Sequence, residues 1–186
     1  GNYKQSVRAG ITPERISSDL DKLVANMRHN KRLFGGLLLA VFKIEYGPQK
    51  GYHWHGYFMY DGDIVFRDSN WGYLLRDYWV DTITKGNGSG YNVNAQKVKT
   101  RLAARLGVNP QDLALGRLKP GNTKQEHNLQ VVIGYLAKSR QGLRVKSEHR
   151  IKQLRIVRGP RYGALHAHLA KDKCPQLPPI QQAAGL

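Results

Sequence analysis

Two histidines separated by one residue, His53 and His55, have a spacing that indicates metal chemistry. They lie in an aromatic-rich run that favours a β-strand, where residues two apart point to the same face. Glu45 precedes them across a short glycine-bounded turn, so a tight hairpin would bring its carboxylate beside both imidazoles. Two imidazoles and one carboxylate with open coordination positions are typical of a catalytic metal site. We therefore predict that Glu45, His53 and His55 bind one metal ion.

Tyr135 is the candidate nucleophile. At about 100° per residue, it shares one side of a predicted helix with Lys138, opposite the apolar stripe. The residues of that stripe are Leu129, Val132, Ile133 and Leu136. A phenol with a pKa near 10 is a weak nucleophile, so attack on phosphorus needs a nearby cation and a metal ion. We predict that Tyr135 and Lys138 form a catalytic pair.

The charge of the chain favours a polyanionic partner. Lys and Arg number 30 against 13 Asp and Glu, which gives a formal net charge of +17. Such a field concentrates nucleic acids, whose backbone phosphates basic side chains contact. The positions expected to bind nucleic acid are Lys97, Lys99, Arg101, Arg105, Arg140, Arg144, Lys146, Arg150, Lys152, Arg155 and Arg158.

The periodicity of the sequence indicates which elements position these residues. Thr12 and Pro13 mark the start of a helix that ends near Asn30. A hairpin follows, with strands at 37–46 and 52–60 around a turn at 47–51. Later elements are a helix over 70–83, a short helix at 99–106, a helix that ends near Gly142 and a strand over 150–158.

Taken in order, these motifs resemble those of the HUH endonucleases. That family combines a His-hydrophobic-His strand, here His53-Trp54-His55, with a helical Tyr-x-x-Lys motif, here Tyr135-Leu136-Ala137-Lys138. The resemblance spans Leu37 to Arg158, and Glu45 falls where related replication proteins place a third metal ligand. Further segments, including Thr84-Lys85-Gly86-Asn87-Gly88, are similar to inovirus-type and YagK/YfjJ-like prophage replication proteins.

The resemblance implies an α+β fold in which a central antiparallel β-sheet with an RRM-like core carries the histidines between flanking helices. It implies Mg²⁺ or Mn²⁺ as the ion, whereas the ligand set alone also admits Zn²⁺. Because Ser139 stands where a second tyrosine would be, it implies a single-tyrosine nickase. Such an enzyme cuts a single-stranded or hairpin origin DNA and holds the 5′ end as a phosphotyrosine. It would start rolling-circle replication or transfer, alongside a host helicase.

Two other interpretations fit part of the pattern. A non-catalytic basic DNA-binding module explains the charge, with His53 and His55 as ordinary strand residues. A cupin-like metalloenzyme explains Gly47 followed by the two histidines, but the glutamate that its motif requires is absent at Met59 and Tyr60. Neither accounts for the tyrosine motif.

The length of the chain predicts one domain at 1–174, which the resemblance implies is an endonuclease domain, and the composition predicts a Pro-, Gln- and Ala-rich tail at 175–186. The apolar run Leu37–Phe42 is too short to span a membrane. Cys174 stands alone, so no internal disulfide forms, and a bacterial cytoplasm is the expected location.

Overall fold

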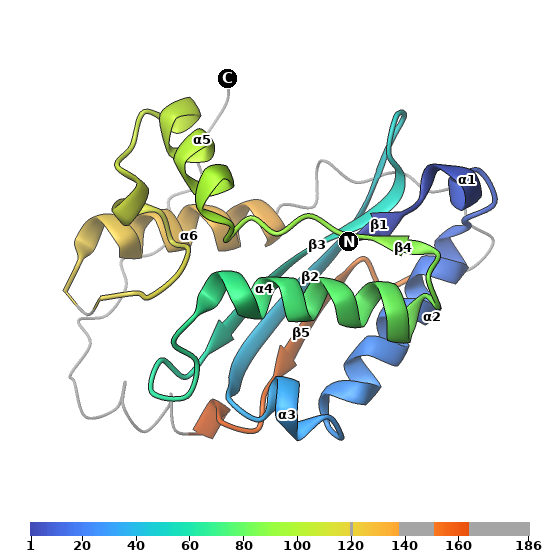
Figure 1. Ribbon diagram of the computed structural model, residues 1–186, viewed down its shortest axis with the longest axis horizontal. Coiled ribbons are helices and arrows are strands. Elements are labelled where there is room, and N and C mark those ends of the chain that lie inside the picture. Colours follow the sequence, from blue (N-terminus) through green and yellow to red (C-terminus); the bar gives the residue numbers. More distant parts are fainter. Residues whose placement is uncertain (120, 138–150, 164–186) are drawn as a thin grey trace.

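The computed structural model describes residues 1–119, 121–137 and 151–163. Its central antiparallel sheet has the strand order β3-β2-β5, from β2 (Leu37–Gly47), β3 (Gly51–Tyr60) and β5 (Leu154–Arg158) (Figure 1). The predicted hairpin and late strand are therefore confirmed, although β5 begins at Leu154 rather than at residue 150. The α+β class, with an antiparallel sheet flanked by helices, is confirmed as well.

A two-stranded ladder of β1 (Asn2–Tyr3) and β4 (Gly88–Ser89) lies beside β3. The Gly1 nitrogen donates to the Trp54 carbonyl at 2.8 Å, and the Trp54 nitrogen donates to the Gly1 carbonyl at 2.8 Å. These two bonds join the ladder to the free edge of β3. The strands consequently follow one another in the order β4, β1, β3, β2 and β5.

The helices include the predicted ones. They are α1 (Gln5–Arg8), α2 (Pro13–Met27), α3 (Lys31–Phe34), α4 (Asp68–Asp77), the π-helix η1 (Tyr78–Ile83), α5 (Gln96–Leu106), the 3-10 helix η2 (Pro110–Asp112) and α6 (Thr123–Ala137). The Thr12 hydroxyl caps α2 by accepting from the Arg15 nitrogen at 3.2 Å. The helix ends at Met27, before Asn30, because the Asn30 side chain caps α3 by accepting from the Leu33 nitrogen.

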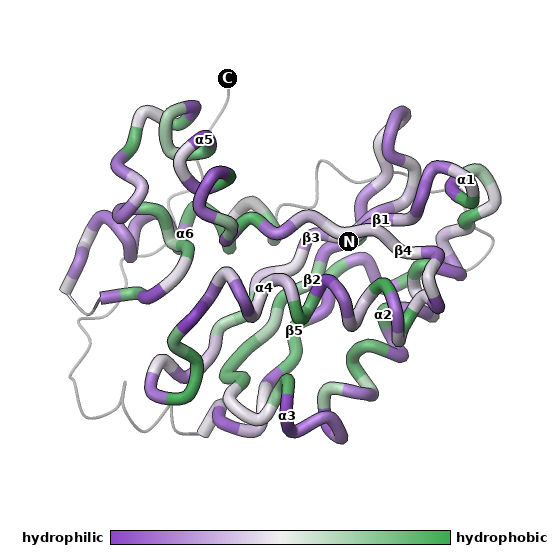
Figure 2. Tube along the Cα trace, viewed as in Figure 1, coloured by the Kyte–Doolittle hydropathy of each residue, from purple (hydrophilic) through white to green (hydrophobic). Residues whose placement is uncertain are grey.

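One face of the sheet forms the hydrophobic core with α2 and η1. The largest fully buried apolar side chains there are Trp79, Tyr3, Phe34, Phe42, Ile16, Leu20, Leu37 and Ile44. Much of β2 and β5 is green in Figure 2, whereas α2 alternates green and purple as an amphipathic helix should. Among the described residues, no helix is both long and apolar enough to cross a membrane.

The predicted helix over 70–83 is not uniform, because its last turn widens into the π-helix η1. The Thr84 hydroxyl shares its one proton between the Trp79 and Val80 carbonyls, both at 2.9 Å, and stabilises this wider turn. Trp79 and Ile83 are thereby both buried in the core. The indole nitrogen of Trp79 donates to the Asn2 carbonyl at 3.1 Å, which holds β1 in place.

The segment from α5 to α6 packs toward the opposite face of the sheet. The Tyr57 hydroxyl on β3 donates to the Ala114 carbonyl at 2.8 Å. The buried Gln125 amide of α6 donates to the Gln111 carbonyl at 2.9 Å, which ties α6 to η2. Helix α6 contacts β2, and Leu136 in its last turn is buried. Of the predicted apolar stripe of α6, Leu136 is buried, and Leu129, Val132 and Ile133 are half-buried.

Candidate metal centre

Glu45, His53 and His55 come together on one face of the β2–β3 hairpin. Glu45 pairs directly with His53 across the antiparallel ladder, and Lys43 pairs with His55. Glu45 Oε2 lies 3.9 Å from His53 Nε2 and 3.2 Å from His55 Nε2. One ligand atom from each of the three residues lies within 4.8 Å of the others. The ligand set predicted from sequence is therefore assembled, and it can hold a metal ion.

The histidines are prepared to act as ligands. His53 Nδ1 lies 3.0 Å from the Gly51 carbonyl, and because a carbonyl only accepts, the hydrogen bond requires a proton on Nδ1. The Nε2 lone pair of the neutral ring is then available on the side of Glu45, as in many metal-binding histidines. Burial lowers the pKa of His55 below its usual value, although the Glu45 carboxylate acts in the opposite direction. Burial thus favours the neutral form of the His55 imidazole.

Glu45 is 9% exposed, and its two carboxylate oxygens face different neighbours. Oε2 faces the histidines, whereas Oε1 lies 3.3 Å from the ammonium of Lys43. Oε1 accepts no hydrogen bond of good geometry from the residues that the structure describes. A buried carboxylate oxygen of this kind retains the capacity to interact with a cation. The donor set and its burial therefore fit a divalent ion.

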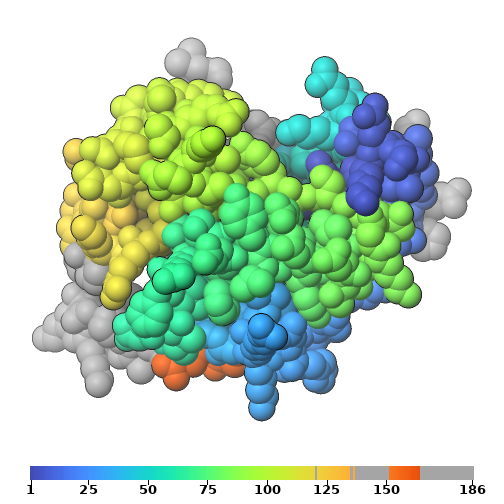
Figure 3. Space-filling model, viewed as in Figure 1, coloured from blue at the N-terminus to red at the C-terminus, as the bar shows by residue number. Residues whose placement is uncertain are grey.

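The tip of the hairpin is held from outside by Arg8. Its guanidinium donates to the Gln49 carbonyl at 2.8 Å and to the Tyr3 carbonyl at 3.3 Å. Gly51 has a φ of +62°, a conformation that glycine adopts readily, and an added Cβ would lie 2.9 Å from Arg8 Cγ. In Figure 3 this tip stands out beside the N-terminal residues. The brace fixes the turn that sets Glu45 opposite His53.

Trp54 points away from the metal ligands into the core, as the alternation of the strand predicts. Its ring packs edge-on against Phe42 at 5.5 Å and Trp79 at 5.2 Å between ring centroids. Gly56 leaves room for this packing, since a Cβ there would lie 2.5 Å from the Trp54 ring. The aromatic contacts anchor β3, so the histidines on its other face have a rigid support.

The tyrosine motif lies partly outside the described residues. The backbone of Tyr135 belongs to the last described turn of α6, which packs on β2, the strand that carries Glu45. The other predicted positions that fall outside the described residues are Lys138, Arg140, Arg144, Lys146 and Arg150. The pairing of Tyr135 with Lys138 therefore stays a prediction, as does the tail at 175–186.

Helix α5 presents a line of cations. Lys97, Arg101 and Arg105 recur every four residues, which places them on one side of the helix, and all three are exposed. Lys99 lies on another side and forms an ion pair with Asp68 that joins α5 to the start of α4. The Lys99 ammonium therefore stabilises the packing of α5 on α4, whereas the three cations of the exposed line have no such role in the fold that the structure describes.

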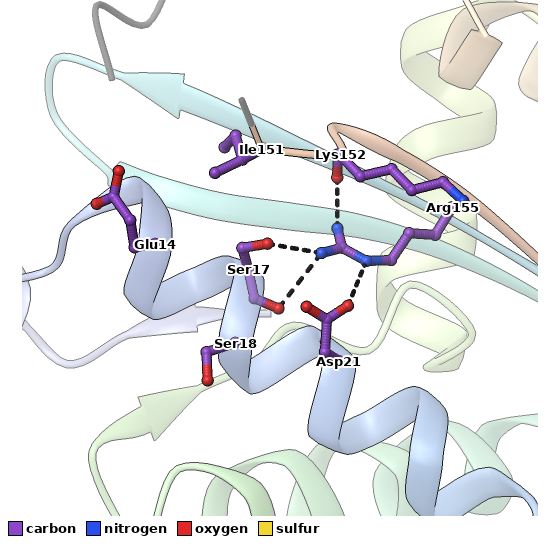
Figure 4. A pocket seen from close by; sticks show the side chains of 7 residues that line it. All are labelled: Glu14, Ser17, Ser18, Asp21, Ile151, Lys152 and Arg155. Atoms are coloured by element: carbon purple, nitrogen blue, oxygen red, sulfur yellow. Dashed lines mark hydrogen bonds and ion pairs between the residues drawn. The ribbon is translucent and has the colours of Figure 1, made fainter. Parts of the chain in front are cut away.

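The prediction that Arg155 contacts DNA is wrong, because its side chain is buried within the fold. Arg155 is 6% exposed, and its guanidinium donates to Asp21 Oδ1 at 3.1 Å and to Ser17 Oγ at 2.8 Å (Figure 4). It also donates to the Lys152 carbonyl. The bonds to Asp21 and Ser17 tie β5 to α2. The alternation of β5 turns Arg155 toward the helices. Arg158, by contrast, is exposed, and its guanidinium stacks over the Tyr162 ring at 4.8 Å. Arg158 and the exposed Lys152 therefore stay predicted DNA contacts.

Replacing Arg155 by Met should lower the free energy of unfolding by about 2 kcal/mol, because the buried carbonyl and hydroxyl partners lose a charged donor. The largely exposed Asp21 carboxylate is rehydrated at little cost. Urea denaturation followed by circular dichroism measures the change. Arg158→Met, which removes the same charge from the surface, should cost less than about 1 kcal/mol. Equal losses would show that Arg155 does not tie the two elements together.

A lysine that the sequence did not single out, Lys43, belongs to this centre. It is 4% exposed and lies on the same face of β2 as Glu45. A signal was present, since Lys43 and Glu45 are two charged residues, two apart, in an otherwise apolar strand.

Comparison with family models, with curated proteins and with solved structures finds no match to this chain.

Proposed function

We propose that this protein is a metal-dependent DNA nickase that cuts one strand and holds the 5′ end as a phosphotyrosine, as the HUH endonucleases do. The observation that carries the proposal is the Glu45-His53-His55 cluster on one face of a braced hairpin. The net charge of +17 supports a nucleic-acid substrate. Origin DNA in single-stranded or hairpin form is the proposed substrate, used to start rolling-circle replication or transfer.

Glu45, His53 and His55 would hold Mg²⁺ or Mn²⁺, which when bound supplies a Lewis acid for the scissile phosphate. The chain itself supplies the nucleophile. The Tyr135 phenol oxygen bonds to phosphorus as the bond to the 3′ oxygen breaks, and the proton lost by the phenol balances the one that the 3′ hydroxyl gains. Lys138 steadies the negative charge that develops on the phosphate. The reverse reaction reseals the strand without a nucleotide cofactor.

The proposal is tested by incubating the protein with a panel of single-stranded and hairpin DNAs in Mn²⁺ or in excess chelator. A covalent protein–DNA adduct should appear on a denaturing gel with Mn²⁺ and be absent with chelator, while DNA binding persists in both. A non-catalytic DNA-binding module predicts the same binding and no adduct in either condition. Binding without cutting across the panel would therefore favour the module.

The exposed line of α5 is expected to contact the DNA backbone. Changing Lys97, Arg101 and Arg105 to Gln should reduce the slope of log affinity against log salt by roughly 2, because each lost phosphate contact to a single strand removes about 0.7. Fluorescence anisotropy at several salt concentrations measures it. The matched control changes three other exposed cations, Lys22, Arg28 and Lys31. If both triple variants lose affinity equally, the contact is not localised to α5.

A further inference from the structure

Lys43 is a buried cation at the candidate metal centre that the proposed chemistry leaves without a role. Its side chain is 5% exposed, and its ammonium lies 3.3 Å from Glu45 Oε1. It is held there by the strand, because Lys43 and Glu45 are two residues apart on β2 and share a face. The ammonium thus sits at the same carboxylate that we assign to the metal ion.

A fixed ammonium and a divalent ion that share one carboxylate repel each other. The repulsion is strong where both charges are shielded from water, as beside Glu45, which is 9% exposed. Because Lys43 is a fixed part of the chain and cannot dissociate, the free energy of this repulsion weakens the binding of the divalent ion. When the imidazoles are neutral, as metal ligands are, the Lys43 ammonium offsets the Glu45 carboxylate, so Lys43 and the three ligands together leave the two positive charges of a bound ion uncompensated.

We propose that Lys43 acts as a built-in counter-ion that holds Glu45 in the metal-free protein and keeps the affinity for divalent ions low until DNA binds. A phosphodiester at the centre supplies the missing negative charge, so ion and DNA each strengthen the binding of the other. The ion pair with Lys43 uses Glu45 Oε1, whereas Oε2 is directed toward the histidines. This inference rests on the metal centre of the proposed function and assigns a positioning residue to it.

Removing the charge of Lys43 should therefore tighten metal binding. Mn²⁺ binding to the full chain, without DNA, is measured from the loss of the free-ion electron paramagnetic resonance signal. Lys43→Gln keeps an N–H donor beside Glu45 and loses the charge, so Mn²⁺ should bind at least about tenfold more tightly. Lys43→Arg keeps the charge and should stay within about threefold of the wild type. Lys31→Gln, the same change at an exposed site on α3, should have no effect.

Equal or weaker Mn²⁺ binding by Lys43→Gln overturns the inference, and so does equal tightening by Lys43→Arg. If the wild type binds Mn²⁺ but the variant does not bind it more tightly, the metal centre survives and the counter-ion role fails. If neither folded protein binds Mn²⁺, the metal centre and the counter-ion role of Lys43 both fail. Should Lys43→Gln not fold, the wild type is titrated with and without single-stranded oligothymidylate. At least about fivefold tighter Mn²⁺ binding with DNA is expected, and no change overturns the inference.

Discussion

Tyr135→Phe is expected to abolish the covalent protein–DNA adduct and to slow strand cleavage by a factor on the order of 10⁴ or more. The change removes one oxygen atom, the one that would bond to phosphorus, and keeps the aromatic ring. The nicking assay in Mn²⁺ measures it directly, with DNA labelled on the segment downstream of the cut. The label should move with the protein on a denaturing gel for the wild type only.

A matched control for this variant is Tyr91→Phe, because Tyr91 is 67% exposed and lies outside the tyrosine motif. It should form the adduct at the wild-type rate. Tyr135→Phe should still bind DNA within about threefold of the wild type, since no charge is lost. An adduct that forms undiminished in Tyr135→Phe would show that another residue is the nucleophile.

His55→Ala should weaken Mn²⁺ binding by about 100-fold and slow cleavage by roughly 10³. The imidazole is a predicted ligand, yet its side chain is 43% exposed, so its removal costs the fold little. The free energy of unfolding should change by less than about 1 kcal/mol. Mn²⁺ titration, nicking rate and urea denaturation of the same preparation separate the loss of the ligand from a loss of structure.

His29→Ala is the control for this substitution, because His29 is exposed beyond the end of α2, on a different element from the ligands. Its metal binding and nicking rate should equal those of the wild type. Undiminished metal-dependent cleavage by His55→Ala would place the metal elsewhere in the molecule. Cleavage that is lost while Mn²⁺ binding stays unchanged would assign His55 to the DNA rather than to the metal.

The metal ligands could be predicted from sequence because strand alternation and a short turn are strictly local constraints. His53 and His55 share a face by the period of two, and the turn at 47–51 fixes the ladder that sets Glu45 opposite His53. Thr12 likewise predicted the start of α2, because a threonine hydroxyl caps the first turn of a helix. Patterns that act within a few residues therefore gave the hairpin and most helices.

What the sequence did not predict depends on contacts between distant segments. The strands β1 and β4 have two residues each, too few to show alternation, and they form because residues near the start of the chain meet the edge of β3. Arg155 looked like a DNA contact until α2 supplied Asp21 and Ser17 as partners. Lys43 differs from these cases, because its partner Glu45 is only two residues away on the same strand, and this local signal was overlooked.

The residue between the two histidines also gives the protein a natural optical reporter. Trp54 lies edge-on to Trp79, with 5.2 Å between their ring centroids, while its backbone connects both ligands. Two indoles this close couple their electronic transitions and produce a paired signal in the ultraviolet circular dichroism spectrum. The paired signal therefore reports the packing of the strand that carries both histidines, and it can be followed without a label or a substrate.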